Sequence, residues 1–228
     1  MSTVFRRVES TNRPEVSARV EAASAAVPQL SQRLRLWLTA AVAGTLLFPL
    51  IYTIEGATRP GYDPLRQTIS SLSFGPTGWI QQLNFALCGV SILAMALVWR
   101  RILAGGVCAT WYPLLRVVEG LGLIAIGIFT TDPLHTAFMI VIVQAMTFDL
   151  FVIARRFWGN PAWRGWAAFS VACALLPMAI MPLFGAGLNP HSALAGYDGL
   201  LERLATNADT IWSVALVARL WIRRPLGL

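Results

Sequence analysis

Long apolar runs are the feature that most constrains how this chain folds. The 228-residue sequence contains six mostly apolar runs, at 34–54, 80–99, 111–130, 134–154, 164–185 and 201–222. Each is about 20 residues long, which is what an α-helix needs to cross roughly 30 Å of hydrocarbon. Hydrophobic residues make up 56% of the chain and charged residues only 13%, unlike a soluble domain. The sequence therefore predicts an all-α integral membrane bundle of six transmembrane helices, forming one domain over residues 31–228.

Residues 1–30 differ from the rest of the chain because they are polar, mixed in charge and free of any long apolar run. A cleavable signal peptide needs an apolar segment, so we expect none here. We expect a disordered cytoplasmic tail over these residues. An interfacial helix is the alternative, because the four arginines of this segment could contact anionic lipid.

The basic residues are all arginines, and their distribution predicts the topology. If the six helices alternate in direction, 14 of the 18 arginines fall on the side of the termini, and Arg59, Arg66 and Arg203 fall on the other. Because positive residues favour the cytoplasmic side, we expect both termini in the cytoplasm of a bacterial cell, with the chain in the inner (plasma) membrane. The net charge of +7 is then a topology signal, and we expect no nucleic-acid partner.

The stretch GYDPLRQTISSLSFGPTGW, at residues 61–79, lies between the first two apolar runs. Asp63 suits a helix N-cap, Pro64 the first helical position, and a Gly-Pro pair marks the end. We therefore expect a short interfacial helix over residues 64–74, between spans 1 and 2. Its apolar face would consist of Leu65, Ile69 and Leu72, and its polar stripe of Arg66, Ser70 and Ser73. This helix either covers an outward-facing polar pocket or simply anchors the second span.

The last apolar run carries charges that a membrane span normally avoids. After Asp209 too few apolar residues remain before Arg219 to cross a bilayer, so the helix must begin near residue 200. This helix carries a polar stripe, because the residues at intervals of four, three and four are Glu202, Thr206, Asp209 and Ser213. Charges on a spanning helix face a partner or a wet cavity, so we expect this stripe to point into the bundle. Two interpretations of the stripe remain open. One is a structural ion pair between Glu202 and an arginine, and the other is a functional site.

A tight turn, FTTDPLH, connects the third and fourth runs and places Asp132 beside His135. Together with the two previous segments it predicts one polar pocket on the outer face, in which Glu202 pairs with Arg66. Arginine forks suit phosphate or carboxylate, so the ligand would be a lipid or a small polar or anionic molecule. The predicted pocket residues are Asp63, Arg66, Ser70, Asp132, His135, Glu202, Arg203 and Asp209.

The motifs GYDPLRQTISSLSFGPTGW, GLIAIGIFTTDP and GLLERL resemble the domain-of-unknown-function family 998 of bacterial and archaeal membrane proteins. The resemblance covers roughly residues 35–222. It matches Asp63, Pro64, Arg66, Ile69, Ser70, Leu72, Asp132, Pro133, Glu202 and Arg203. Members often carry a longer loop after the Asp-Pro pair and more than one histidine in the next span, whereas here His135 stands alone. The resemblance implies a polytopic membrane protein and no particular activity.

A second set of charges lies deeper, on the third and fourth runs. Arg116, Glu119 and Asp149 have similar depths on adjacent spans, so we expect a structural ion pair between Arg116 and one of the carboxylates. The three cysteines have no metal-ligand spacing, which is typical of packing residues. We expect no metal and no cofactor.

Three classes of function remain open. The first is a binding protein whose outer pocket recognises a membrane lipid or a small polar molecule, and this is the class that we expect. The second is an intramembrane hydrolase or lipid-modifying enzyme that uses the Ser, Asp, His and Glu side chains of the outer face. The third is a small transporter, although the sequence contains no internal repeat.

Overall fold

The computed structural model of the chain describes residues 31–103, 105–131 and 133–222, and its regular elements there are all helices. The predicted tail over residues 1–30 lies outside this range. The six α-helices are α2 (Gln32–Thr58), α3 (Gly78–Ile102), α4 (Gly106–Ile128), α5 (Leu134–Trp158), α6 (Arg164–Gly187) and α7 (Asp198–Ile222). Two short 3-10 helices, η1 (Ser70–Ser73) and η2 (Pro161–Trp163), lie in the connections.

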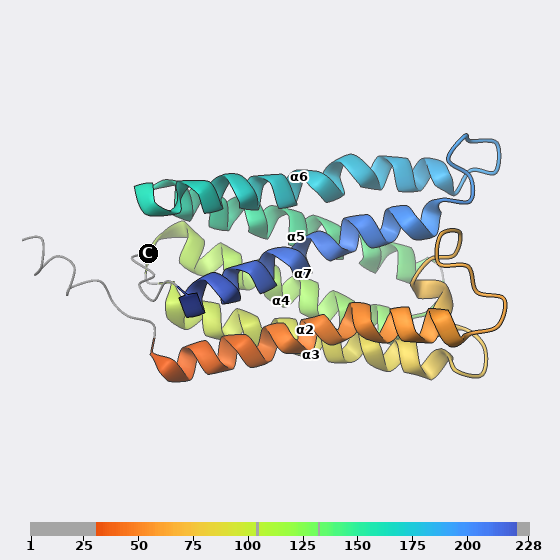
Figure 1. Cartoon of the computed structure of the whole chain (residues 1–228), viewed down its shortest axis with the longest axis horizontal. Helices are drawn as coiled ribbons and strands as arrows, with labels where there is room; N and C mark the ends of the chain where they lie inside the picture. Colours follow the sequence, from red (N-terminus) through yellow and green to blue (C-terminus); the bar gives the residue numbers. More distant parts are fainter. Residues whose placement is uncertain (1–30, 104, 132, 223–228) are drawn as a thin grey trace, which may run out of the picture.

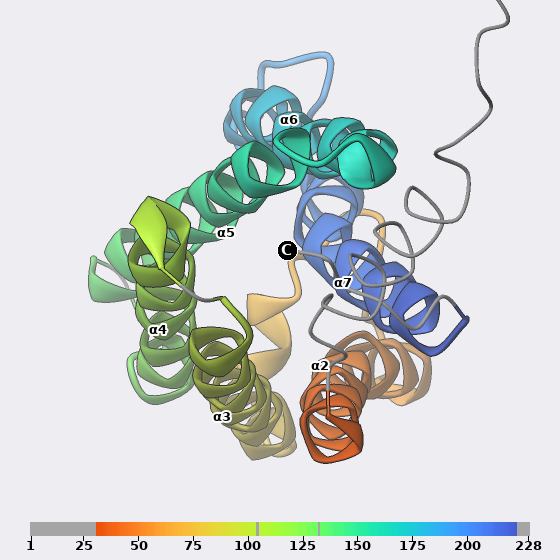
Figure 2. The same ribbon diagram turned by 90° about the vertical axis from the view of Figure 1, so that its left-hand side faces the viewer.

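The six helices form a ring. Each helix packs against the next one along the chain, and α7 closes the ring by packing against α2 (Figure 2). Neighbours run in opposite directions, as short connections between long helices require (Figure 1). We call the end of the ring that carries residues 59–77 the loop end, and the opposite end, which carries Arg100, Arg155 and Arg219, the arginine end.

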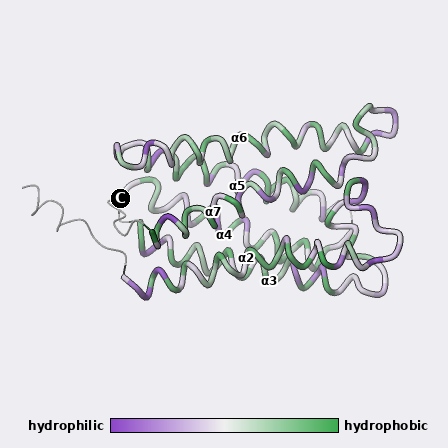
Figure 3. Tube along the Cα trace, viewed as in Figure 1, coloured by the Kyte–Doolittle hydropathy of each residue, from purple (hydrophilic) through white to green (hydrophobic). Residues whose placement is uncertain are grey.

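The outer surface of the ring is apolar, as a surface in contact with lipid must be. Leu97, Ile128 and Ile222 are among many large apolar side chains that point outward, with exposed fractions of 66%, 68% and 79%. The hydropathy of the trace stays mostly apolar along the helices, and polar segments gather near their ends and in the connections (Figure 3). Such a surface would drive aggregation in water and is stable against hydrocarbon tails.

Within the described residues, five segments are long and apolar enough to cross a membrane: Gln32–Thr58, Gly78–Ile102, Gly106–Ile128, Leu134–Trp158 and Pro161–Gly187. The α7 helix has 25 residues and runs alongside them, but Glu202, Arg203 and Asp209 lower its hydropathy (Figure 1). The chain is thus an all-helical bundle with the character of a multi-pass membrane protein.

Two glycines allow close contact between backbones inside this bundle. A Cβ atom at Gly89 would lie 2.5 Å from the carbonyl oxygen of Gly120, so only glycine fits where α3 crosses α4. A Cβ atom at Gly199 would lie 2.3 Å from the carbonyl oxygen of Gln67, so glycine lets the loop approach the start of α7. Small residues serve the same purpose at helix crossings in membranes generally.

The helix predicted over residues 64–74 does not form as one element. Residues 63–67 form a turn in which the amide of Leu65 donates to Asp63 Oδ1 at 3.0 Å, and the only regular helix is the four-residue η1. The physical reason is that the backbone groups in between bond to α7 instead of to one another. The amide of Ile69 donates to Glu202 at 2.5 Å, and the amide of Leu200 donates to the carbonyl of Leu65 at 3.0 Å.

Candidate functional site

The loop over residues 59–77 folds inward and covers the loop end of the ring (Figures 1 and 2). Its apolar side chains Ile69 and Leu72 are buried, with exposed fractions of 1% and 0%, so they seal the ring from this end. Leu65, which was predicted on the same apolar face, is 50% exposed because the turn before η1 directs it away. The loop is therefore a plug in the bundle, and three charged side chains hold it there.

Arg203, on the first turns of α7, is the first of these side chains. Its Nη1 atom lies 2.7 Å from the carbonyl oxygen of Pro64 and 3.0 Å from that of Gln67. Its Nη2 atom donates to the hydroxyl of Tyr62 at 2.5 Å, and its guanidinium lies over the rings of Tyr52 and Tyr62. Burial raises the pKa of Tyr62, so the phenol stays protonated and can donate in turn to the loop carbonyls. Arg203 thus binds the plug.

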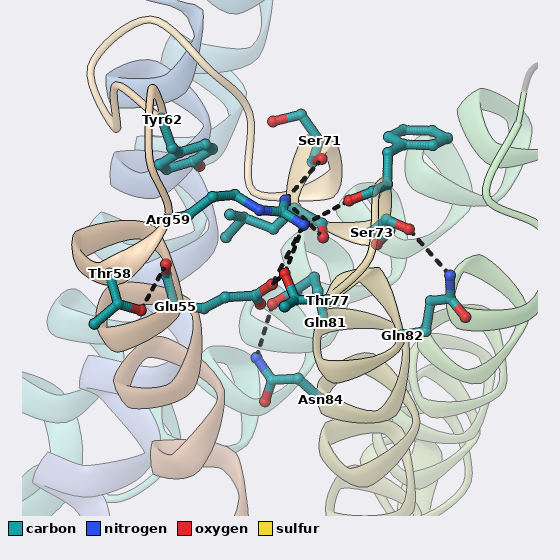
Figure 4. A network of polar contacts seen from close by, with 12 residues as sticks. Glu55, Thr58, Arg59, Tyr62, Ser71, Ser73, Thr77, Gln81, Gln82 and Asn84 are labelled. Carbon is teal, nitrogen blue, oxygen red and sulfur yellow. Dashed lines mark hydrogen bonds and ion pairs between the residues drawn. The ribbon is translucent and has the colours of Figure 1, made fainter.

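Arg59, at the end of α2, is the second, and it holds the other half of the plug (Figure 4). Its guanidinium donates to the carbonyl oxygens of Leu72 and Phe74 at 3.0 and 2.5 Å, and to the hydroxyl of Thr77 at 2.9 Å. Glu55, one turn earlier, lies 3.8 Å from this guanidinium and is buried. The ion pair fixes the arginine under η1 and so ties the plug to α2 and α3.

Glu202 is the third, and it is 2% exposed. One carboxylate oxygen accepts a hydrogen bond from the amide of Ile69 at 2.5 Å. This bond satisfies a backbone donor that has no acceptor within a helix. The pair predicted between Glu202 and Arg66 is wrong. Arg66 lies 3.4 Å from Asp63 in the same turn, and its side chain is 73% exposed.

A cavity of about 410 Å³ lies between α5 and α6, beside the plug. Its side walls are mostly apolar, and they include Ile140 and Leu188, whose exposed fractions of 58% and 59% show that the cavity opens on the side of the bundle. Its polar end includes Thr68, Ser70, His135 and Glu202, and Thr136 and Gln144 are the other polar residues that line it. Three of the predicted pocket residues, Ser70, His135 and Glu202, therefore line one cavity although they come from three separate segments.

The orientation of His135 determines the chemistry of this polar end. Its Nδ1 atom lies 3.0 Å from the carbonyl oxygen of Phe129, and because a carbonyl only accepts, Nδ1 is the protonated nitrogen. In the neutral ring Nε2 is then an acceptor, and this buried atom has no partner among the described residues. Glu202 is also an acceptor, and the hydroxyls of Thr68 and Ser70 contact each other at 3.2 Å. The polar end is thus rich in acceptors.

The remaining predicted pocket residues lie elsewhere. Asp63 and Arg66 are on the outer turn of the plug, and Arg203 lies against its carbonyls. Asp209 is buried deeper and pairs with Arg116. Asp132 lies outside the described residues.

Arg116 is completely buried and holds three carboxylates. Glu119 lies 3.2 Å away one turn along α4, Asp149 on α5 lies 2.5 Å from Nε, and Asp209 on α7 contacts both terminal nitrogens. The Asp149 contact is close in distance, but its angle is not that of a hydrogen bond. The structure therefore brings together the predicted trio and adds a third acid. In the part of the chain that the structure describes, no group of histidine, cysteine or acidic side chains is arranged as a metal site.

Sequence reasoning missed the roles of Arg59, Tyr62 and Tyr52. Tyr62 and Arg203 bond across 141 residues, and the hydroxyl of Tyr52 accepts from Asn207 at 2.8 Å. One signal was available, because Arg59 follows a glutamate by four residues at the end of an apolar run. An arginine there needs acceptors, and the loop after it supplies carbonyls.

A family model described as "Protein of unknown function (DUF998)" matches residues 42–219. The matched range contains the plug, the cavity between α5 and α6, and the cluster around Arg116. No curated protein and no solved structure matches the chain.

Proposed function

Because the chain belongs to the DUF998 family, whose function is unknown, we propose its function from the site itself: it binds an uncharged, hydroxyl-bearing amphiphile in the cavity between α5 and α6. The observation that carries this proposal is the composition of the cavity. Apolar walls open to the side of the bundle, and acceptors gather at one end. A lipid with a neutral headgroup matches both parts.

The size and position of the cavity support this ligand class. A volume of about 410 Å³ lies within the range of small-molecule sites, roughly 300–1,000 Å³. An amphiphile would enter from the membrane between Ile140 and Leu188 and place its chain along α5 and α6. Its hydroxyl hydrogens would then bond to His135 Nε2, which has no partner among the described residues, and to Glu202, which accepts the amide of Ile69.

An anionic ligand, which the sequence favoured, is disfavoured at this cavity. The arginines on which that expectation rested are Arg66, which is exposed beside Asp63, and Arg203, which donates to the plug. Neither lines the cavity. A phosphate placed beside the Glu202 carboxylate would meet repulsion rather than a guanidinium fork.

We propose six spans with α7 as the sixth, the arginine end in the cytoplasm and the chain in a bacterial inner membrane. The length of α7, 25 residues, and its course alongside the other helices support the sixth span. The excess of described arginines at the arginine end over Arg59, Arg66 and Arg203 at the loop end supports the orientation. Reporter fusions after Arg101 and Arg156 should then report cytoplasm, and fusions at Asp63 and His191 the outside. A reversed pattern at any two of these sites contradicts the topology.

Hydrolysis of a lipid ester is the second candidate, because Ser70, His135 and Glu202 line the same cavity. A serine nucleophile needs a base within hydrogen-bond reach. Ser70 contacts Thr68 at 3.2 Å, and Nε2 of His135 has no partner among the described residues. The described geometry therefore favours binding over catalysis.

Equilibrium binding of a fluorescent monoacylglycerol to the protein in nanodiscs tests the proposal, with lysophosphatidic acid of the same chain length as the anionic comparison. We expect the neutral probe to bind more tightly. His135→Ala removes an acceptor and should weaken binding by about tenfold, the loss of about one hydrogen bond. Val143→Phe fills the cavity and should weaken binding by at least as much because it occupies the space of the ligand. His191→Ala changes the only other histidine, which is exposed, and serves as the matched control.

Equal binding by all four proteins, or tighter binding of the anionic probe, contradicts the proposal. Release of fatty acid from the monoacylglycerol by the wild type, and its loss in Ser70→Ala, would establish the hydrolase instead. The Thr68 hydroxyl, which Ser70 contacts, is accessible and can bond to water in Ser70→Ala, so this variant should fold.

A further inference from the structure

The cluster around Arg116 carries more acidic groups than its arginine can neutralise. Glu119, Asp149 and Asp209 are 3%, 0% and 5% exposed, and all three lie in contact with one guanidinium. If all three were ionised, the cluster would hold one positive and three negative charges. Burial without water penalises each unpaired charge, and intramembrane acids normally find partners or take up protons.

Several buried polar atoms at the cluster make no well-aligned hydrogen bond within the described residues. They are Oδ1 of Asp149, the hydroxyl of Tyr112 and the hydroxyl of Ser213. The three residues are 0%, 0% and 2% exposed, so bulk solvent does not reach them. Tyr112 lies beside Arg116 on the preceding turn of α4, and Ser213 follows Asp209 by one turn. Unpaired buried polar atoms mark a place where a further hydrogen-bonded species belongs.

A small cavity of about 50 Å³ reaches this cluster from the loop end. Glu119 and Asp209 line it at the cluster, Glu202 lines it under the plug, and Thr206 lies between Glu202 and Asp209 on α7. Such a space has room for about one or two water molecules with several polar partners. Glu202 also lines the larger cavity between α5 and α6, so one carboxylate touches both spaces.

We propose that Glu119, Asp149 and Asp209 around Arg116 form a proton-binding site, and that Glu202 connects this site to the loop end of the bundle. The site takes up protons because one guanidinium balances only one of the three carboxylates. The protons pass between carboxyl oxygens and the hydrogen-bonded water of the small cavity, which needs no other reactant. The proposal does not depend on the ligand of the larger cavity.

Other titratable groups face the cluster from the remaining helices. They are Tyr112 on α4, Cys88 on α3, Cys173 on α6 and Glu202 on α7. Thiols and phenols ordinarily lose their protons above neutral pH, and arginine stays charged throughout. The carboxyl groups are therefore the ones that exchange protons at physiological pH.

Infrared spectroscopy of the protein in lipid detects the proton directly, because a protonated carboxyl group has its own C=O stretching band, which shifts in D₂O. We expect such a band at pH 7 in the wild type. Three variants should each be compared with the wild type: Glu119→Gln, Asp149→Asn and Asp209→Asn. At least one of them should reduce the intensity of this acid band. Asp63→Asn is the matched control, since that carboxylate is on the outer turn with a side chain that is 46% exposed.

Glu202→Ala tests the connection, because it should slow the D₂O shift of the cluster band by tenfold or more. If a cluster variant fails to fold, wild-type protein labelled with ¹³C-aspartate gives the same information. Asp149 and Asp209 are the buried aspartates of the described chain, so an isotope-shifted acid band at pH 7 reports the cluster.

An acid band that is absent, or one that is changed by none of the three variants and not by the ¹³C-aspartate label, overturns the proposal. Loss of the band on adding sodium chloride at constant pH also overturns it, because the site would then take a metal cation. An unchanged rate of D₂O exchange in Glu202→Ala overturns the connection to the loop end.

Discussion

Arg203→Ala should release the plug while leaving the helical ring folded. Nη1 lies within 3.0 Å of the carbonyl oxygens of Pro64, Gln67 and Gly199, and Nη2 donates to Tyr62. A hydrogen bond from a charged group contributes about 1.5–3 kcal/mol net. Because the carbonyls of Pro64 and Gln67 are at exposed positions and regain water, we expect a total loss of about 3 kcal/mol rather than the sum of four bonds.

Hydrogen exchange measures this loss where it occurs. The amides of Arg66, Gln67, Ile69 and Leu72 are hydrogen-bonded in the plug, so their protection reports its opening. A loss of about 3 kcal/mol should raise exchange there by roughly 100-fold, since 1.4 kcal/mol corresponds to tenfold. Amides in the middle of α4 should keep their protection, because no bond of Arg203 reaches that helix.

Arg66→Ala is the matched control, since it removes an arginine from the same plug. Its pair with Asp63 is exposed, and such pairs contribute about 0–1 kcal/mol, so exchange should rise by less than about fivefold. If Arg203→Ala exchanges no faster than Arg66→Ala, the plug is held by something other than these bonds. A loss of protection in α4 as well would mean that Arg203 supports the whole bundle.

Two further substitutions test the packing of the ring through thermal unfolding in one detergent. Gly89→Ala places a Cβ atom 2.5 Å from a backbone oxygen of α4 and should destabilise the protein by about 1–3 kcal/mol, whereas Gly185→Ala, with nothing within 4 Å, should not. Equal unfolding temperatures would show that α3 and α4 can move apart freely. Ser170→Ala leaves the buried indole N–H of Trp212 without its acceptor at 2.8 Å and should also lose about 1–3 kcal/mol. Ser91→Ala, whose hydroxyl bonds only to its own helix, should change stability far less, and a similar loss in both would refute this interpretation.

The helices could be predicted from the sequence because apolar length is a local property. Every predicted span lies largely within an observed helix, and α2 extends beyond the predicted range of 34–54 at both ends, to Gln32 and Thr58. The first turn of the plug could also be predicted from the local sequence. Asp63 does cap a turn, with its carboxylate accepting the amide of Leu65. The conformation of the chain after that turn depends on groups more than 130 residues away, which no local pattern contains.

The partners of the charged residues were harder to predict for a physical reason. A buried carboxylate is satisfied equally well by a backbone amide or a guanidinium, so Glu202 could not be matched to Ile69 from sequence. The stripe on α7 does point inward, since Glu202 and Asp209 are 2% and 5% exposed. Seven residues of helix nevertheless separate the two by about 10 Å along the axis, so Glu202 bonds to the plug whereas Asp209 pairs with Arg116.

The closure of the ring by its first and last helices also determines when its charges can meet during synthesis. Arg116 and its partner Asp209 are 93 residues apart in the chain, and Asp209 lies on α7, which leaves the ribosome after the other five helices of the ring. Until α7 arrives, the guanidinium of α4 has only Glu119 and Asp149, and the plug lacks both Glu202 and Arg203. A nascent chain that stops before α7 therefore has an open ring, a plug without its two anchors on α7, and an Arg116 whose terminal nitrogens lack the Asp209 carboxylate.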